Sequence, residues 1–444
     1  MLVHNFIDPN STFKKKLALL LLFIIIALTL LFVYYYNNDV EAKKPHVDRP
    51  AMKTWFHRFN KSDADEVHSI VQTAQGYLVL GDTSPSDRNS FVKTLDFNAK
   101  ELWSKVFASN INVTKPVGLE LASSYLISYK SISTDTRLKP NIITGFNLHI
   151  DKITHRILDR SSQVFSSIAP SNEGYVVSGE HNRLFSYAQN GTILWEKTYS
   201  RGESFTGINT RYVIAKYEIS RGKILKVIAV EKNNFLVLGQ VRLEGGKRRS
   251  LWIFKVDSSG EVLWEKTFQN NSSYPSDLTF TSEGDYLVLS NDSRHHQIRC
   301  QKYNQNGTLL WSKDYSNRRK SLSWHMAQTG DGSTILTGST NQKDYVKTIW
   351  LLKINKDGTL LWQKKHTSAI GDYPSTIIAT LDGGVLLGGK TTKQGIRVEK
   401  IYKGHVLKQF KLLSEGAWLL KLDENGEGIH SPLNFETTQE WSEL

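Results

Sequence analysis

The sequence predicts an all-β protein, a β-propeller of about seven four-stranded antiparallel blades preceded by one N-terminal transmembrane helix. Three observations lead to this prediction. A long uncharged apolar run occupies residues 17–36, a strand-turn-strand phrase recurs along the rest of the chain, and a second hairpin phrase precedes each copy of the first. Repeated four-stranded units at a spacing of roughly 40–65 residues are typical of propeller blades.

Residues 17–36 are predicted to form a membrane-spanning helix. A helix of this length covers about 30 Å, the thickness of the hydrocarbon core of a bilayer. Lys14, Lys15 and Lys16 precede the run, and three tyrosines close it at residues 34–36. Basic residues stay on the cytoplasmic side and aromatic rings favour the interface. We therefore expect residues 1–16 in the cytoplasm and the rest of the chain outside it.

A cleaved signal peptide is the alternative interpretation of this segment. Val40-Glu41-Ala42 offers small residues at offsets that suit a cleavage site. The apolar run, however, is longer than the roughly 7–15 residues of a signal-peptide core. The retained anchor is favoured, with residues 37–53 as a short polar tether. It predicts a single-pass protein of the cytoplasmic (inner) membrane whose C-terminal domain is extracytoplasmic, either periplasmic or extracellular.

The first recurring phrase is a hairpin that alternates apolar and polar residues. Clear copies lie at 251–268, 300–315 and 350–366, looser copies at 91–107 and 184–199, and a final copy begins at Trp418. Their turns contain pairs such as Asn190-Gly191 and Asp357-Gly358. Asn-Gly and Asp-Gly supply the positive φ angles of type I′ turns, so each phrase is predicted to be a two-residue β-hairpin.

The second recurring phrase is another hairpin, with turns such as Gln75-Gly76 and Asp382-Gly383. Two hairpins make one four-stranded unit. A more divergent copy that begins at residues 117–131 completes a series of seven such units. Because one four-stranded sheet cannot bury both of its faces, the units must stack around a common axis. The propeller is expected to span residues 54–433, followed by a C-terminal tail at 434–444.

Tryptophan recurs at one position of the outermost strand of the units, at Trp103, Trp195, Trp264, Trp311 and Trp362. We interpret these indoles as structural residues that fill the gap between neighbouring blades. The last unit lacks an outer strand, and residues 54–60 place Trp55 where the missing tryptophan belongs. The N-terminal strand at 54–60 is therefore predicted to complete the last blade, which removes an exposed sheet edge.

The phrases WLLKLDENG, NGTLLWSK and SGEVLWEK resemble the repeats of the quinoprotein-like (PQQ-type) β-propeller superfamily. They are most similar to those of bacterial membrane-anchored extracytoplasmic propellers of unknown function. The resemblance covers about residues 54–433 and implies the fold, whereas the superfamily includes dehydrogenases, envelope scaffolds and proteins without known activity. Its quinone-dependent dehydrogenases generally have eight blades, a calcium site and a catalytic Asp. In this chain Asp257, Asp357 and Asp423 belong to hairpin turns, where Asp suits the turn geometry.

No catalytic, cofactor-binding or metal-binding residue can be singled out from the sequence. Cys300 is the only cysteine, so no internal disulfide forms, and it is interpreted as a small buried residue. His295 and His296 are adjacent and would point to opposite faces of a strand, which is poor geometry for a shared metal. His325, on or near an inner strand, is a candidate residue of the central channel.

Charge and anchoring limit the expected partners. The formal net charge is +13, but a domain outside the cytoplasm does not meet nucleic acid. Anionic lipid headgroups, acidic polysaccharide or an acidic protein fit this charge, and solvated loop charge is the alternative. The sequence thus favours a non-catalytic protein-binding or scaffold module with an envelope protein as partner and no cofactor. A quinone-dependent oxidoreductase and a carbohydrate-binding propeller are the alternatives, and the oligomeric state is not indicated.

Overall fold

The structure is a computed structural model. It describes residues 54–428 except for 60–65, 84–88, 108–111, 122–123, 133–142, 153–156, 162–165, 180–181, 201–202, 207–222, 243–248, 269–272, 293–296, 317–320, 342–346, 368–371, 392–394, 403–404 and 413–415. The chain divides into the units Met1–Ala51 and Met52–Leu444, and the described residues belong to the second. The predicted anchor at 17–36, its flanking segments and the tail at 434–444 lie outside the described residues. Within the described part, no helix is long and apolar enough to cross a membrane.

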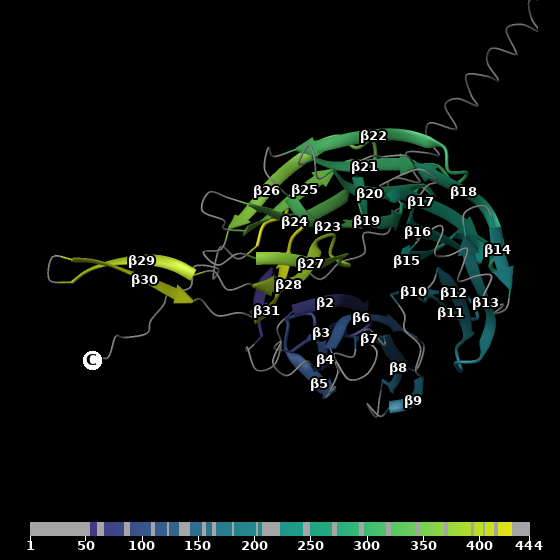
Figure 1. The fold of residues 1–444 in the computed structure, drawn as a ribbon, viewed down its shortest axis with the longest axis horizontal. Helices are drawn as coiled ribbons and strands as arrows, with labels where there is room; N and C mark the ends of the chain where they lie inside the picture. The colour runs from purple at the N-terminus through teal and green to yellow at the C-terminus, as the bar shows by residue number, and fades with distance from the viewer. Residues whose placement is uncertain are drawn as a thin grey trace, which may run out of the picture. The chain divides into compact units, whose positions relative to one another are not determined.

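The described strands form six four-stranded sheets, one five-stranded sheet and a separate two-stranded hairpin, all antiparallel (Figure 1). Each sheet is named here after its innermost strand. The β2 sheet contains β2 (Glu66–Thr73), β3 (Gly76–Asp82), β4 (Ser90–Leu95) and β5 (Glu101–Phe107). The β6 sheet contains β6 (Asn112–Glu120), β7 (Ser124–Ile132), β8 (Ile143–Asp151) and β9 (Ile157–Ser161). The β10 sheet contains β10 (Ser167–Pro170), β11 (Gly174–Ser178), β12 (Arg183–Ala188), β13 (Ile193–Ser200) and β14 (Glu203–Thr206).

The remaining sheets repeat the four-stranded pattern. The β15 sheet contains β15 (Lys223–Val230), β16 (Asn234–Arg242), β17 (Arg249–Val256) and β18 (Val262–Phe268), with one 3₁₀ turn, η1 (Glu231–Asn233). The β19 sheet contains β19 (Ser273–Phe280), β20 (Tyr286–Asp292), β21 (Gln297–Tyr303) and β22 (Leu309–Ser316). The β23 sheet contains β23 (Ser321–Gln328), β24 (Thr334–Asn341), β25 (Lys347–Ile354) and β26 (Leu360–Thr367). The β27 sheet contains β27 (Asp372–Ala379), β28 (Val385–Thr391), β31 (Gly416–Leu422) and β1 (Trp55–Arg58).

The sheets close into a propeller. The first strand of each sheet contacts the first strand of the next, in the cyclic order β2, β6, β10, β15, β19, β23, β27 and back to β2 (Figure 1). Closure joins the two ends of the chain's repeat region, because β1 pairs with β31 in the register Trp55 to Lys421. The strand expected from residues 54–60 thus lies at the outer edge of the last sheet.

The expectation of about seven four-stranded blades needs a correction. In the described residues only six sheets have four strands, because the β10 sheet gains β14, whose Ser204 pairs with Tyr199 of β13. The sequence repeat did not indicate this strand because it lies outside the repeated phrases. A further hairpin, β29 (Gly395–Tyr402) and β30 (His405–Leu412), is inserted between β28 and β31 and pairs only within itself.

The predicted type I′ turns are also wrong. Type I′ requires positive φ at both central residues, whereas in the 257–260 turn only Gly260 has positive φ (+80°). The Gly260 N–H donates to Asp257 O at 3.0 Å, and Asp257 Oδ1 accepts the N–H groups of Ser259 and Glu261, each at 2.9 Å. The acidic side chain therefore orders a longer turn with a bulge at its end, and glycine is needed at one position only.

The core lies between neighbouring sheets. At one junction Leu236 and Leu238 of β16 pack with Tyr286 and Val288 of β20, and equivalent clusters occupy the other junctions. The largest fully buried side chains include Trp252, Trp324, Trp350 and Trp418. Burying apolar surface yields about 25 cal/mol per Å². Stacking of the sheets therefore stabilises the propeller by removing this apolar surface from water.

Candidate functional site

The tryptophans that recur in the sequence reach from one sheet to the outer hairpin turn of the next, a contact we call the indole clasp. In four cases the indole N–H donates to a backbone oxygen of that turn: Trp55 to Phe97 (3.0 Å), Trp195 to Ser258 (2.7 Å), Trp264 to Gln305 (2.9 Å) and Trp311 to Lys356 (3.2 Å). Trp103 and Trp362 occupy the same position of their strands, opposite Thr94 and Lys353. The polar edge of a half-buried indole needs such a partner.

The face of the clasping indole lies against the glycine of the same turn. A Cβ atom on Gly307 would lie 3.0 Å from Trp264, and one on Gly358 would lie 2.9 Å from Trp311. Both glycines also have left-handed backbones, with φ of +75° and +74°. Glycine at this position therefore satisfies the turn and admits the indole at the same time.

Other groups reinforce the clasp in some junctions. Next to Trp195, Lys197 forms an ion pair with Glu261, and the Tyr199 hydroxyl donates to Gly260 O at 2.8 Å. The Tyr315 hydroxyl donates to Gly358 O at 2.6 Å in the same way. These side chains come from alternate positions of the Trp-x-Lys-x-Tyr pattern, so one face of the outer strand supplies all three contacts.

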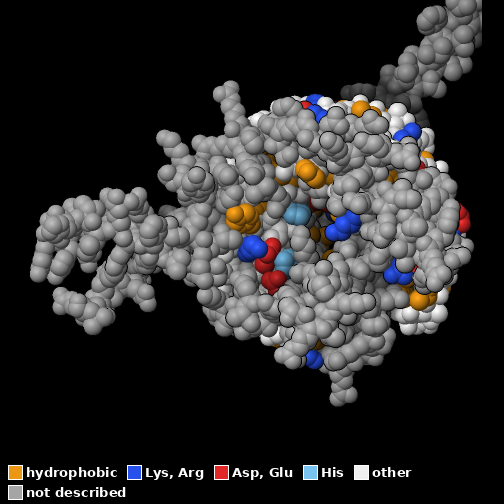
Figure 2. All heavy atoms as spheres, in the orientation of Figure 1, with side chains coloured by type: hydrophobic (Ala, Val, Ile, Leu, Met, Phe, Trp, Pro, Cys, Tyr) orange, Lys and Arg blue, Asp and Glu red, His pale blue; other side chains and the backbone are white. Residues whose placement is uncertain are grey.

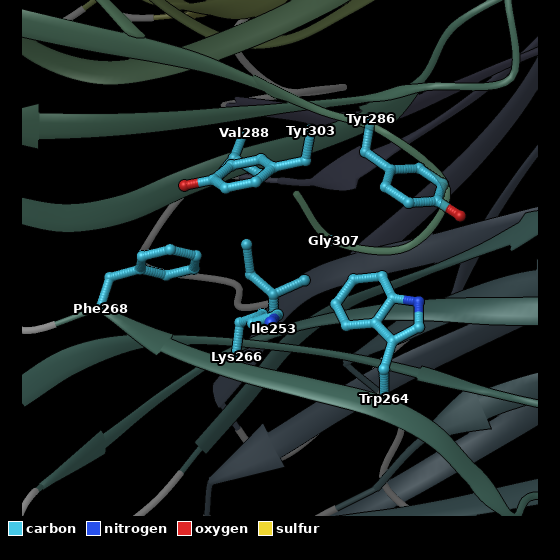
Figure 3. Close-up of a pocket in the computed structure, with 8 residues that line it drawn as sticks. All are labelled: Ile253, Trp264, Lys266, Phe268, Tyr286, Val288, Tyr303 and Gly307. Atoms are coloured by element: carbon cyan, nitrogen blue, oxygen red, sulfur yellow. The ribbon is translucent and has the colours of Figure 1, made fainter. Parts of the chain in front are cut away.

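A narrow apolar cavity lies at the clasp between the β15 and β19 sheets (Figure 3). Trp264, Phe268 and Ile253 line one side, and Tyr286 and Tyr303 line the other. Phe268 stands where other clasps have a tyrosine, so the hydroxyl contact to the next turn is missing here. The space has essentially no room for even a water molecule, whereas ordinary ligand pockets hold roughly 300–1,000 Å³. It is a seam between two sheets.

A polar cluster lies where the innermost strands of the β2 and β27 sheets meet. Glu66 Oε1 accepts a hydrogen bond from Ser375 Oγ at 2.6 Å, and Glu66 also pairs with Lys390. His68 Nδ1 lies 3.7 Å from Glu66 Oε1, and His68 Nε2 lies 2.9 Å from Asp82 Oδ2. Burial opposes ionisation of Glu66, but His68, Lys390 and the hydrogen bonds lower its pKa below the usual value. The cluster therefore presents charge near the axis.

Two members of this cluster are bulged residues. The β2–β3 register skips His68, and the β27–β28 register skips Ser375. A bulge re-aims the extra side chain and is common beside functional sites. Figure 2 shows histidine and side chains of both charge signs gathered in the hollow at the centre of one face. The His68 side chain is only 7% exposed, so this cluster chiefly joins two sheets.

A second polar contact joins three innermost strands. Asp277 of β19 is 5% exposed and forms an ion pair with Lys226 of β15. Its other carboxylate oxygen accepts the Met326 N–H of β23 at 2.9 Å. A buried carboxylate loses its hydration, so it needs an opposite charge and hydrogen bonds such as these to remain ionised. Asp277 thus ties the β15, β19 and β23 sheets together near the axis.

Apolar side chains lie exposed on the fourth strand of five sheets, which is the outermost strand except in the β10 sheet, where β14 lies beyond β13. The residue directly before the clasping tryptophan is a leucine with 43–51% of its surface exposed in five sheets, at Leu102, Leu194, Leu263, Leu310 and Leu361. Ile193, Leu309 and Leu360, one position earlier, are also exposed. We call these eight side chains the rim leucine band. These residues lie on separate strands of five sheets, and in the β10, β19 and β23 sheets two neighbouring side chains are both exposed. Larger exposed apolar patches mark interaction sites more often than single residues do.

The histidines and the cysteine discussed in the sequence analysis lie at the following positions. His325 lies in β23, the innermost strand of its sheet, and the register shifts directly before it. His295 and His296 lie outside the described residues. Cys300 is buried, and burial raises the pKa of its thiol to about 12, so it stays protonated at neutral pH. In the described part of the chain, no group of three or more His, Cys, Asp or Glu side chains is placed to hold a metal ion.

Neither a protein-family model nor a curated protein sequence matches this chain. Among solved structures, BBS1N from its complex with ARL6DN aligns with TM-score 0.48 and 10% identity over 85% of this chain and 99% of that chain. Hydrazine synthase of Kuenenia stuttgartiensis aligns with TM-score 0.46 and 10% identity over 80% of this chain and 97% of that chain. Similarities this distant carry no argument about this chain, and its function must be argued from its own surface.

Sequence reasoning missed both the polar cluster at the axis and the rim leucine band. His68, Glu66 and Asp82 belong to a repeat copy whose equivalents carry other residues, so no recurring pattern marks them. The leucines were visible in the Leu-Trp pairs of the fourth strands, but alternation predicts one buried face for a strand, and the leucine of another such pair, Leu251-Trp252, is buried. Only the position of the fourth strand, on the outer side of the ring, shows that this leucine stays exposed.

Proposed function

We propose that this chain is a non-catalytic, membrane-anchored propeller of the cell envelope that binds a protein partner through the rim leucine band. The sequence supports the anchor, with residues 17–36 spanning the cytoplasmic membrane and the propeller outside it. The exposed leucines carry the proposal for protein binding. Five sheets repeat the same exposed leucine at the same position, which a solvated rim does not require.

The outermost strands also offer hydrogen-bonding edges. At the β10 sheet the chain itself adds β14 to the edge of β13, in the register Lys197 to Thr206 through Ser200 to Glu203. This shows that an outermost strand of this propeller accepts a further antiparallel strand. A partner segment could bind another edge in the same way, with backbone hydrogen bonds for affinity and the leucines for apolar contact.

The geometry argues against the carbohydrate-binding alternative. Sugar-binding propellers use indoles whose faces are free at a rim. Here the Trp264 and Trp311 faces lie on Gly307 and Gly358, and their N–H groups are bonded to the next sheet. The recurring tryptophans are therefore engaged in joining sheets.

The proposal is tested by site-specific photo-crosslinking in intact cells that express the full-length chain. A photoreactive residue replaces Leu263 or Leu310 in the rim leucine band, and Leu381, which is 64% exposed in the turn between β27 and β28, serves as the matched control. We expect one discrete protein adduct from positions 263 and 310 that position 381 does not form. Leu263→Ser with Leu310→Ser should abolish binding of the identified protein without lowering Tm.

Two outcomes would overturn the proposal. Identical adduct patterns at the rim and control positions would show that the leucines are not a specific surface. An adduct that persists unchanged in the Leu263→Ser, Leu310→Ser chain, crosslinked from position 361, would place the partner contact elsewhere. Removal of residues 17–36 tests the anchor separately, since a partner in the same membrane should then be lost.

A further inference from the structure

One outer hairpin turn receives no tryptophan from the preceding sheet. In six sheets the register places a tryptophan of the fourth strand opposite a fixed position of the third: Trp55 opposite Lys421, Trp103 opposite Thr94, Trp195 opposite Ser186, Trp264 opposite Lys255, Trp311 opposite Lys302 and Trp362 opposite Lys353. In the β6 sheet that position, next to the register shift, is Asp159 opposite His149. The sequence has no tryptophan between residues 103 and 195, so β9 offers none to the outer turn of the β10 sheet.

The surface of the β10 sheet beside this turn matches the surface that receives Trp264 in the β19 sheet. On the β19 side, Trp264 faces two tyrosines, a valine and a glycine, namely Tyr286, Val288, Tyr303 and Gly307 (Figure 3). The β10 sheet has the same residue types at the equivalent positions, Tyr175, Val177, Tyr187 and Gly191. The two tyrosines pair across the strands in both sheets, Tyr175 with Tyr187 and Tyr286 with Tyr303. The β10 sheet therefore repeats a surface that binds an indole.

The two turns also agree in sequence and in backbone. Residues 189–192 read Gln-Asn-Gly-Thr, as do residues 305–308. Gly191 has φ of +84° and Gly307 of +75°, and the N–H of each donates at 2.9 Å to the carbonyl three residues earlier. Gln305 O accepts the Trp264 N–H at 2.9 Å, and Gln189 O is the corresponding acceptor. The turn at 189–192 thus offers both the glycine and the carbonyl that an indole uses.

The two turns differ in what covers the glycine. A Cβ atom on Gly307 would lie 3.0 Å from Trp264, whereas no described atom lies within 4 Å of a Cβ on Gly191. The equivalent glycines of four other outer turns are buried and Gly191 is partly exposed; the four are Gly260, Gly307, Gly358 and Gly426. We call residues 189–192 the indole slot. Among the described residues, it lacks the side chain that its counterpart in the β19 sheet holds.

The described tryptophans of this chain are engaged elsewhere. Six occupy the clasp position of a fourth strand, and the other four are fully buried: Trp252, Trp324, Trp350 and Trp418. A second copy of the chain has the same described tryptophans in the same places. Trp441 lies outside the described residues. This favours a tryptophan that is supplied by another protein.

The slot adjoins two members of the rim leucine band. Ile193 and Leu194 directly follow the turn and are 47% and 43% exposed. Strand β14 pairs with β13 only from Lys197 to Ser200, so it does not cover the edge of β13 beside these two residues. A partner segment that contacts Ile193 and Leu194 therefore has the indole slot within reach of its next side chains.

We propose that the protein partner inserts a tryptophan side chain into the indole slot and contacts Ile193 and Leu194 beside it. Its N–H donates to Gln189 O and its ring lies on Gly191, as Trp264 does at residues 305–308. The partner is thereby specified as a protein with an exposed tryptophan. This inference rests on the proposed function for the existence of a partner, whereas binding of an indole by the slot can be measured without one.

A small indole probe tests the slot in the full-length chain in detergent micelles. The probe is N-acetyl-5-fluorotryptophan amide, and fluorine NMR line broadening measures its binding. Asp159→Trp should fill the slot from β9 and reduce the broadening several-fold. Gly191→Asn is a second blocking variant, because Asn tolerates a left-handed backbone and its side chain covers the place of the ring. Trp264→Ala opens the 305–308 turn and should increase the broadening.

Three results with the probe would overturn the proposal. Equal broadening by the parent and by both blocking variants would show that the slot binds no indole. Equal binding of N-acetyl-4-fluorophenylalanine amide, which lacks the ring N–H, would show that Gln189 O is not used. Several-fold stronger probe binding by Trp441→Phe would show that a tryptophan of this chain already occupies the slot.

Crosslinking in intact cells tests the partner. A photoreactive residue in place of Asn190 should form an adduct with a partner peptide that contains tryptophan, and Asp159→Trp should abolish this adduct. An adduct with a second copy of the chain, or one unaffected by Asp159→Trp, would overturn the proposal. If position 263 forms its partner adduct and position 190 forms none, the slot proposal fails while protein binding through the rim leucine band stands.

Discussion

Lys421 Nζ lies 2.7 Å from Asp382 Oδ2 in the interior of the β27 sheet, and the lysine side chain is fully buried. Lys421 also donates to Leu422 O at 2.9 Å. Lys302 and Lys353, at the same position of β21 and β25, pair with the acidic residues Asp285 and Asp331 beside the inner hairpin turns. In three consecutive sheets, a buried lysine of the third strand thus pairs with an acidic residue beside the inner hairpin turn, and both partners are buried in the pair of Lys421 and Asp382.

Removing one partner of the buried pair should be strongly destabilising. Lys421→Met leaves Asp382 without its cation, and breaking a buried pair in this way costs about 3–5 kcal/mol. Lys353→Met is the matched control and should cost less, because the Asp331 side chain is 53% exposed and water replaces its partner. The free energy of unfolding in urea measures both variants. Equal losses would show that burial of the acid does not govern the effect.

Stability should fall in acid through the same carboxylates. Burial opposes ionisation of Asp331, but the hydrogen bonds from Thr329 and Lys353 lower its pKa to about 2, and Lys421 lowers the pKa of Asp382. Because the unfolded pKa is about 3.9, the charged carboxylates stabilise the fold above that pH. This contribution is lost as pH falls from about 4 towards 2. Urea titrations across this range should show a weaker pH dependence for Asp382→Asn than for the parent. Parallel curves for the two proteins would show that Asp382 does not contribute to the pH dependence of stability.

Two glycine substitutions should separate backbone strain from the indole contact. Gly307→Ala and Gly191→Ala both place a Cβ on a left-handed residue, which costs about 1–2 kcal/mol. Only Gly307→Ala also pushes against an indole within the described residues, since its Cβ would lie 3.0 Å from Trp264. We expect a larger loss of unfolding free energy for Gly307→Ala, measured by urea denaturation of the full-length chain. A larger loss for Gly191→Ala would contradict the geometry.

The closing strand should be essential to stability. Trp55 is 8% exposed, donates to Phe97 O at 3.0 Å and packs with Tyr77 at a centroid distance of 6.2 Å. Trp55→Ala should cost about 3–5 kcal/mol. Hydrogen exchange should accelerate in β1, β31 and β2 together, because β1 joins the two ends of the ring. Leu102→Ala, at an exposed side chain, should change stability by less than about 0.5 kcal/mol. Similar losses of stability in the two variants would argue against a role of Trp55 in closing the ring.

Features of the fold were predicted correctly where the sequence pattern that encodes them is local in the chain. The hairpins, their order and the clasping position of Trp264 follow from alternation and from spacing that recurs along the chain, both of which are local. The turn type was predicted wrongly, because an Asn-Gly or Asp-Gly pair fits two turns of different length. The choice between them depends on Asp257 and its equivalents, which accept two backbone N–H groups.

Repetition in the amino-acid chain was sufficient to predict a ring of antiparallel four-stranded sheets, since units that cannot bury both faces alone must stack. It was not sufficient to place His68 beside Glu66 and Asp82, to expose Leu310 or to add β14 to the β10 sheet. Those features depend on contacts between strands distant in sequence and on which strand faces solvent. They were decided by tertiary structure, because burial and the pairing of charges are properties of neighbours that only packing brings together.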